Sequence, residues 1–175
     1  MRDPRSLSSG RDRRLTDSGA YNLLWMGRWL ERAENMARTL DAAALEAMRT
    51  GRKSKSFYGA LRSVEAAWGV TAEGKANPLP ALIRDDPASS IYQSLTRARD
   101  NANEIAPLEL IQALNAGVLE LEQLKALPDT PEEVHRLMTS VLERLKEVYK
   151  GIENRWFHGE VVSEDEVYRR FVDQQ

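Results

Sequence analysis

The chain has 175 residues, of which 30% are charged and 42% hydrophobic, and it contains no cysteine. This length and composition are typical of one folded domain, and the lack of cysteine excludes structural disulfides, thiolate metal sites and cysteine nucleophiles. The formal net charge of −2 carries no signature of nucleic-acid binding, and no apolar run approaches the roughly 20 residues that span a bilayer. We therefore expect a cytoplasmic protein with no nucleic-acid partner and no membrane segment.

The first 16 residues differ in character from the rest of the chain. Residues 1–14, MRDPRSLSSGRDRR, carry five arginines against two aspartates and almost no apolar side chain. This composition predicts a disordered basic N-terminal tail over 1–16 and a folded domain over 17–175. An electrostatic arm for an acidic partner or nucleic acid is the alternative reading of the tail, which we disfavour because no aromatic residues lie between the arginines.

Helical patterns begin directly after the tail. A cap at Asp17 or Ser18 predicts a helix that runs to about Arg49 and ends near Gly51. After a polar loop, apolar side chains return at helical spacing over SFYGALRSVEAAWG, residues 56–69. The sequence AEGKANPLP that follows has the glycine and proline content of a loop.

Two prolines organise the middle of the chain. Asp86 followed by Pro87 predicts a capped helix start, with the helix continuing toward Ile105. Pro107 ends that helix and begins the next, whose apolar positions repeat at helical spacing as far as Leu124.

The last long helix has the clearest start signal. Thr130 and Glu133 form a capping box around Pro131. Apolar residues then recur in steps of four and three, at Val134, Met138, Val141, Leu145, Val148 and Ile152. Ser163 and Glu166 suggest one more capped helix at the C-terminus. No convincing strand pattern occurs, so we predict an all-α, single-domain helical bundle of about five to six helices.

The segment YNLLWMGRWLERAENMARTLD, residues 21–41, carries an unusual polar stripe. One side of this helix is apolar and predicts the core face. Arg28, Glu31, Arg32 and Asn35 share the opposite side, at steps of three, four and seven. Because Tyr21, Leu24 and Trp25 lead into this stripe one and two turns earlier, we expect the first two turns to be buried on both sides.

The stripe allows two interpretations. A solvated helix face is the first, with surface ion pairs that contribute about 0–1 kcal/mol each. The second is a buried or ligand-facing polar site, because Glu31 reaches Arg28 but faces Arg32 only awkwardly, which leaves a guanidinium for a group outside the helix. Within the second interpretation, a structural network is favoured over an active site.

The same segment closely resembles the signature of the alpha-E domain, a bacterial and archaeal family of helical proteins with an "ER" motif. The matching positions are Trp25, Gly27, Arg28, Trp29, Glu31, Arg32, Ala33, Glu34, Asn35, Ala37, Arg38, Leu40 and Asp41. A second family segment is similar to ARDNANEIAPLELIQALN, with Ala98, Arg99, Asp100, Asn101, Ala102, Leu114 and Asn115 in place.

The chain also departs from the family pattern. Asn103 stands where the family usually has Arg, and Ala106-Pro107 replaces an Arg-Glu pair. Family members are typically longer and carry a second "GR..ERA" helix, which is not found here after residue 150. The resemblance covers about residues 18–125 and indicates a short or diverged member.

The resemblance implies a function only by association, because family members commonly occur beside ATP-grasp and transglutaminase-like proteins. We therefore expect a non-catalytic accessory module that binds such a partner in peptide or amide ligation. Assembly of the chain into a homo-oligomer is a further possibility. The alternative is a catalytic or substrate-binding subunit in which Arg28 and Arg32 hold an anion beside Glu31. A glutamate flanked by arginines stays ionised, which suits a general base poorly.

The candidate polar site spans two segments that echo one another, each with an acid-Asn pair. If the two helices pack antiparallel, their polar side chains could meet in one layer, with Arg97 taking part. The site residues are Arg28, Glu31, Arg32, Glu34, Asn35, Arg38, Arg99, Asp100 and Asn101. No catalytic residue, metal ligand or cofactor is assigned; Glu132 and His135 have a di-iron spacing, but only one copy of it occurs.

Overall fold

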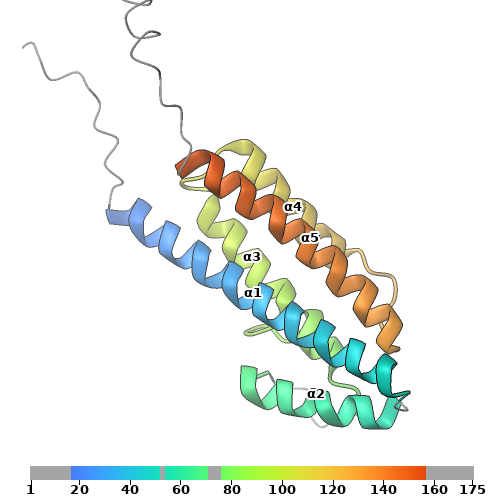
Figure 1. The fold of residues 1–175 in the computed structure, drawn as a ribbon. Helices are drawn as coiled ribbons and strands as arrows, with labels where there is room; N and C mark the ends of the chain where they lie inside the picture. Colours follow the sequence, from blue (N-terminus) through green and yellow to red (C-terminus); the bar gives the residue numbers. More distant parts are fainter. Residues whose placement is uncertain (1–16, 52–53, 71–75, 157–175) are drawn as a thin grey trace, which may run out of the picture.

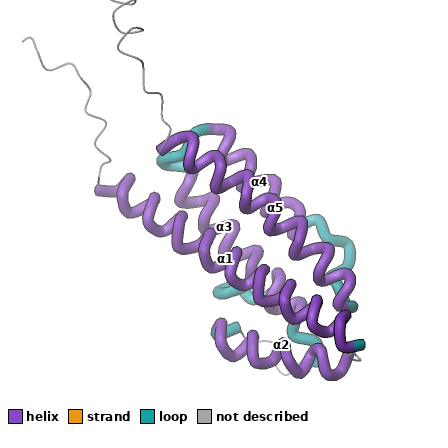
Figure 2. Tube along the Cα trace, viewed as in Figure 1, coloured by secondary structure: helices purple, strands orange, loops and turns teal. Residues whose placement is uncertain are grey.

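In the computed structural model, the described residues are 17–51, 54–70 and 76–156. They form six helical segments and no strand (Figure 1, Figure 2). The segments are α1 Asp17–Thr50, α2 Ser54–Trp68, η2 Ala81–Asp85, α3 Ile91–Ala102, α4 Leu108–Glu122 and α5 Pro131–Trp156. The all-α prediction of five to six helices is confirmed. The expected N-terminal tail and the helix expected from Ser163 lie outside the described residues.

Four of the helices form an antiparallel bundle. α1 packs against α3 and α5, and α4 packs against the same two helices, so α1 and α4 lie on opposite corners (Figure 1). Near the start of α5, His135 contacts α1: its Nδ1 lies 2.6 Å from Asp41 Oδ1. α2 stands outside this bundle and packs against α1.

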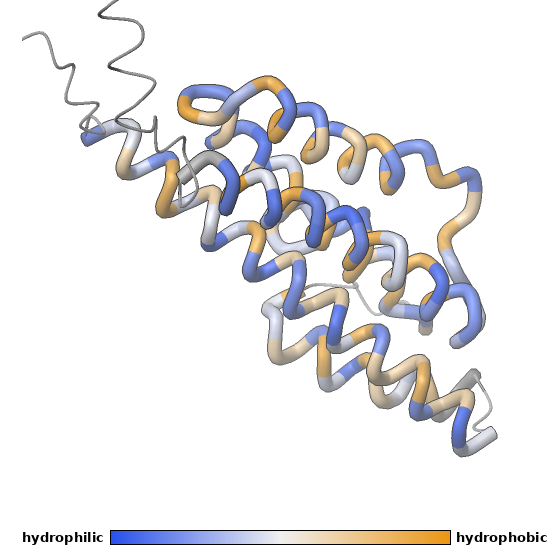
Figure 3. Tube along the Cα trace, turned by 45° about the horizontal axis from the view of Figure 1, so that its top comes forward, coloured by the Kyte–Doolittle hydropathy of each residue, from blue (hydrophilic) through white to orange (hydrophobic). Residues whose placement is uncertain are grey.

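The core follows from the hydrophobic periodicity of each helix (Figure 3). On α5 the predicted series is buried from Val134 through Val148, and Ile152 is partly buried against the same core. On α1 the core side alternates large and small residues: Met26, Leu30, Met36 and Leu40 are fully buried, and so are Ala33, Ala37 and Ala44. Small side chains allow close approach of neighbouring helices, and the long polar side chains are left at the flanks. None of the helices in residues 17–51, 54–70 and 76–156 combines the length and hydropathy needed to cross a membrane.

Two predicted helix starts, at Thr130 and at Asp86, can be compared with the structure. The capping box before α5 forms as predicted: Glu133 N donates to Thr130 Oγ1 at 3.3 Å, and Thr130 N donates to Glu133 Oε2 at 3.3 Å. The backbone N–H groups of Asp129 and Thr130 both donate to the Glu133 carboxylate, and these two bonds hold the pKa of that carboxyl below its usual value. The predicted helix start at Asp86-Pro87 is wrong.

Asp86 instead organises a turn. Its Oδ1 accepts from the backbone N–H groups of Ala88 and Ser89, at 2.9 and 2.7 Å. The cap of α3 is Ser90, whose Oγ accepts from Gln93 N at 3.2 Å. Asp and Ser both compete for backbone donors in this way, and here the aspartate closes the turn while the serine begins the helix. The helix also ends at Ala102 rather than near Ile105.

Candidate functional site

Arg32 of the polar stripe on α1 makes two contacts with the end of α2. Its Nη2 donates a hydrogen bond of 2.8 Å to the backbone oxygen of Trp68, and its guanidinium carbon lies 5.4 Å from the centre of the Trp68 ring. The first contact satisfies a carbonyl at a helix end, where intrahelical partners run out. The second is a cation–π contact. Arg32 is therefore a structural residue in the contact between α1 and α2.

The end of α2 explains why that carbonyl is available. Gly69 has φ +64 and follows the last helical residue. Gly69 N donates to Ala66 O at 3.4 Å, and Val70 N donates to Glu65 O at 3.1 Å. These two bonds form a Schellman motif, in which the carbonyls of Glu65 and Ala66 accept from the backbone. The Trp68 carbonyl is not used in this motif and accepts from the Arg32 side chain.

The other side chains of the stripe do not join a buried network. Arg28, Glu31 and Asn35 are exposed, and none of the three side chains forms a hydrogen bond or ion pair with a described residue. Adjacent positions on a helix point about 100° apart, so Glu31 faces outward although its neighbour Arg32 reaches α2. In this Glu-Arg pair, the Glu31 carboxylate therefore points to solvent, and the Arg32 guanidinium contacts α2.

Glu34 and Arg38 form a separate contact at the flank facing α5. Arg38 Nη2 lies 2.7 Å from Glu34 Oε1, one helical turn away. Glu34 also accepts a hydrogen bond from the Tyr149 hydroxyl. Burial raises the pKa of Tyr149 well above its usual value, and the hydrogen bond and charge of Glu34 raise it further.

The α3 residues do not meet the stripe, so the expected single polar layer is wrong. Arg99 pairs with its neighbour Asp100 at 3.0 Å, and Asn101 Nδ2 donates to Arg97 O at 2.7 Å. Only Arg97 reaches α1, where its guanidinium carbon lies 4.6 Å from the centre of the Trp29 ring. Arg99 and Asn101 therefore make their polar contacts within α3 rather than with the α1 stripe.

An aromatic row runs along the first half of α1. Tyr21 and Trp25 have ring centres 6.0 Å apart, and Trp25 and Trp29 are stacked at 5.9 Å. Residues four apart share one helix face, which accounts for the row. The side chains of Tyr21, Leu24 and Trp25 are 60%, 58% and 38% exposed.

The expected burial of these first two turns on both sides is therefore wrong. The reason is the length of α2, which has 15 residues against 34 in α1. α2 ends at the level of Arg32, so it covers the second half of α1 and stops short of the first (Figure 1). We call the surface left open the α1 face, comprising Tyr21, Leu24, Trp25, Gly27, Arg28 and Glu31.

Gly27 is an exposed glycine on α1. It lies inside a helix, is exposed, and has no atom within 4 Å of the position that a Cβ would occupy. Glycine in a helix interior costs roughly 0.5–1 kcal/mol relative to alanine. No neighbour within the described chain requires this glycine, and the same holds for Gly59 of α2.

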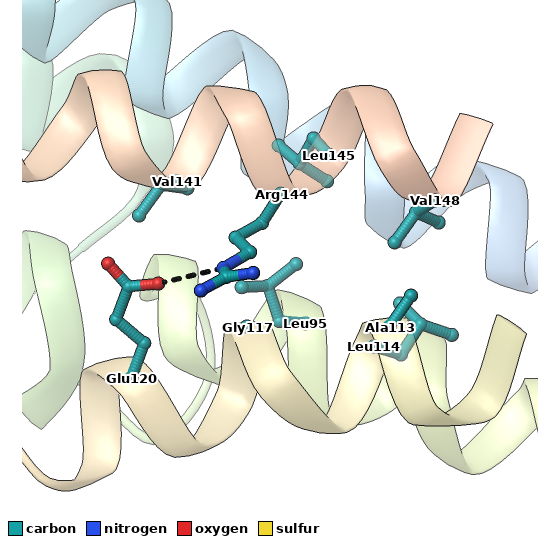
Figure 4. A pocket seen from close by; sticks show the side chains of 9 residues that line it. All are labelled: Leu95, Ala113, Leu114, Gly117, Glu120, Val141, Arg144, Leu145 and Val148. Atoms are coloured by element: carbon teal, nitrogen blue, oxygen red, sulfur yellow. Dashed lines mark hydrogen bonds and ion pairs between the residues drawn. The ribbon is translucent and has the colours of Figure 1, made fainter. Parts of the chain in front are cut away.

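The interior offers little space for a ligand. A cavity of about 10 Å³ lies between α3, α4 and α5, beside Leu95, Gly117 and Arg144 (Figure 4). At most one water molecule fits such a volume. Glu120 and Arg144 close its rim, with 3.3 Å between Oε2 and Nε (Figure 4). This cavity is therefore too small to be a ligand site.

Sequence reasoning missed two contacts. One joins Arg32 to Trp68, and the other joins Arg97 to Trp29. A signal for Trp68 exists in the sequence, because Trp-Gly at a helix end predicts an αL cap with an open carbonyl. No local pattern predicts the contact between Arg97 and Trp29, which depends on how α1 and α3 pack.

Comparison with protein families gives one match. The model of the Alpha-E family, described as a predicted alpha-helical domain with a conserved ER motif, matches residues 19–160. Comparisons with curated proteins and with solved structures gave no match. Glu-Arg occurs at 31–32 and again at 143–144, and the first lies within residues 21–41, the segment that resembles the family signature. The match spans most of the chain, and the protein belongs to the Alpha-E family of helical domains.

Proposed function

We propose that this protein is a non-catalytic binding module that docks a partner protein through the α1 face. The observation that carries the proposal is the exposure of Tyr21, Leu24 and Trp25 beside Arg28, which has no ion partner among the described residues. Trp, Tyr and Arg are the residues that most often dominate the free energy of protein–protein binding. An exposed group of them on a rigid helix supports a docking surface.

The catalytic alternative has less support. It needs Arg28 and Arg32 to converge on one anion beside Glu31. Arg32 is instead occupied by the carbonyl and ring of Trp68, while Arg28 and Glu31 point outward. A small-molecule site usually lies in a concave pocket with converging polar groups, and the α1 face is a convex helix surface.

The class of partner rests on the resemblance described above, in which family members accompany ATP-grasp and transglutaminase-like proteins. We propose that one of these is the partner. The α1 face adds a chemical requirement: the partner surface should be apolar with a carboxylate placed for Arg28, since charge complementarity steers association and fixes orientation.

A pull-down of the tagged full chain from the source cell, read by mass spectrometry, tests the proposal. The test variant combines Leu24→Ser with Arg28→Glu, both at exposed positions. Leu119→Ser is the matched control, because Leu119 is 45% exposed on α4, away from the α1 face.

We expect the wild type and the control to capture the partner, and the double variant to lose at least about tenfold in capture, the equivalent of one or two removed interface contacts. Equal capture by all three proteins would contradict the α1 face as the docking surface. Recovery of neither class of partner would contradict the assignment of the partner.

A further inference from the structure

One stripe of α1 faces directly away from the bundle. Asp17, Tyr21, Leu24 and Arg28 follow one another in steps of four, three and four, and at about 100° per residue they lie within about 60° of one another around the helix. All four are exposed, Tyr21 and Leu24 by 60% and 58%. We call these four residues the α1 seam. Alternating steps of three and four are the spacing with which two helices pack side by side.

The two ends of the α1 seam carry opposite charges. Neither the Asp17 carboxylate nor the Arg28 guanidinium forms an ion pair or a hydrogen bond with a described residue. The helix between them is about 17 Å long, so the two groups cannot reach each other. Each is therefore available to a charged group outside the described chain.

The α1 seam is complementary to a second copy of itself. Its steps read the same in both directions, so a second α1 laid antiparallel brings Asp17 opposite Arg28 and Tyr21 opposite Leu24. Each contact then occurs twice about a two-fold axis, with the apolar pairs at the centre and the ion pairs at both ends. A parallel arrangement would place Asp17 against Asp17 and Arg28 against Arg28, which like-charge repulsion disfavours.

The surroundings of the α1 seam leave room for a second helix. The core side of α1 is turned the other way, where Met26 and Ala33 are buried. α2 ends at the level of Arg32, one turn beyond the seam (Figure 1). A second helix laid over residues 17–28 therefore meets neither the bundle nor α2.

We propose that two copies of this chain associate through the α1 seam as an antiparallel, two-fold symmetric helix pair. The contact covers Tyr21 and Leu24 of both copies and forms two ion pairs, each between Asp17 of one copy and Arg28 of the other. It extends over only about three turns of each helix. Interfaces of so small an area are weak, so the dimer forms and dissociates with concentration.

Self-association competes with the docking of a partner protein. Tyr21, Leu24 and Arg28 belong both to the α1 seam and to the α1 face, so the same surface cannot bind a second copy and a partner protein at once. This consequence rests on the proposed function, whereas the dimer itself is tested on the isolated protein.

Charge exchange at the ends of the α1 seam, followed by sedimentation equilibrium of the full chain, tests the dimer. Asp17→Arg and Arg28→Asp each place like charges opposite one another at both ends of the helix pair. An equimolar mixture of the two variants brings opposite charges together again, because one copy is then basic at both ends of the seam and the other acidic at both. Glu122→Arg is the matched control, since it makes the same change of charge as Asp17→Arg at an exposed position of α4.

We expect the dimer fraction of the wild type and of the control to rise with concentration up to about 1 mM. Each seam variant alone should dimerise at least about tenfold more weakly, because like charges replace both ion pairs, and the mixture should recover the association of the wild type. A wild type that is monomeric throughout this range would overturn the inference. A mixture that associates no better than its two components would also overturn it, because the dimer would then form through another surface.

Capture of a partner protein by Asp17→Arg tests the competition separately, because Asp17 lies outside the α1 face. With the bait at a concentration at which the wild type is largely dimeric, we expect this variant to capture more, since an equilibrium that hides the binding surface lowers the apparent affinity. Unchanged capture would overturn the competition. If neither protein captures a partner, the proposed function fails, while the sedimentation result still decides whether the chain dimerises.

Discussion

Arg32 of α1 donates a hydrogen bond of 2.8 Å to the backbone oxygen of Trp68 and lies over its ring at 5.4 Å. This relationship separates the two residues of the Glu-Arg motif. The arginine stabilises the contact between α1 and α2, while Glu31 faces outward beside Arg28. The motif therefore combines a structural residue with part of an exposed surface.

Arg32→Ala should lower the free energy of unfolding by about 2 kcal/mol, because it removes a charged hydrogen bond and a cation–π contact. Arg32→Lys should lose less, since it keeps the charge but not the planar fork. Urea denaturation measures both. Arg28→Ala is the control and should change stability by less than about 0.5 kcal/mol; an equal cost at Arg28 would contradict the division of roles.

Gly69→Ala should destabilise the protein by about 1–2 kcal/mol, because alanine at φ +64 is strained. The same change shifts the Trp68 carbonyl away from Arg32, so the costs of Gly69→Ala and Arg32→Ala should not add. A double-mutant cycle measures this coupling. Full additivity would show that the end of α2 does not position the carbonyl.

Gly117→Ala should have the opposite sign and stabilise the protein by about 0.5–1 kcal/mol through higher helix propensity. A Cβ at this position would lie 3.7 Å from Leu95 Cδ1 and 4.0 Å from Arg144 Cβ, which are ordinary contacts. The added methyl group also lies beside the small cavity (Figure 4). A lower midpoint of thermal unfolding than in the wild type would contradict this packing.

Stability should fall as the pH rises from about 10 to about 12, in part through Tyr58. Burial, and then the hydrogen bond to Asp129, raise the pKa of Tyr58 from 10.0 to about 12. The unfolded state releases this proton first, so the contribution of Tyr58 is complete below the unfolded pKa and is lost as the pH approaches the folded pKa.

Unfolding free energies measured across this range should decline less steeply in Tyr58→Phe than in the wild type. Burial and Glu34 raise the pKa of Tyr149 as well, so some dependence on pH remains in the variant. Identical slopes for the two proteins would show that Tyr58 titrates normally in the folded state.

Much of the fold was predictable because its signals are local. The long apolar repeat of α5 and the capping box at Thr130 placed that helix correctly. The start of α3 was not predictable in the same way. Asp86 and Ser90 are both good caps, and only the folded turn shows that Asp86 bonds to Ala88 and Ser89.

The functional surface was harder to predict, because its exposure depends on another helix. Leu24 and Trp25 have the sequence pattern of a buried surface, and they are open because α2 ends at Trp68. The pairing of Arg32 with Trp68 joins positions 36 residues apart. Neither fact is contained in the pattern of α1 alone.

Glu31→Ala tests the central claim most directly, because it distinguishes an exposed binding surface from a buried polar network. We expect its free energy of unfolding to stay within about 0.5 kcal/mol of the wild type, while partner capture falls. A loss of about 3–5 kcal/mol in stability would contradict the account, since a cost of that size arises when a buried ion pair loses one member.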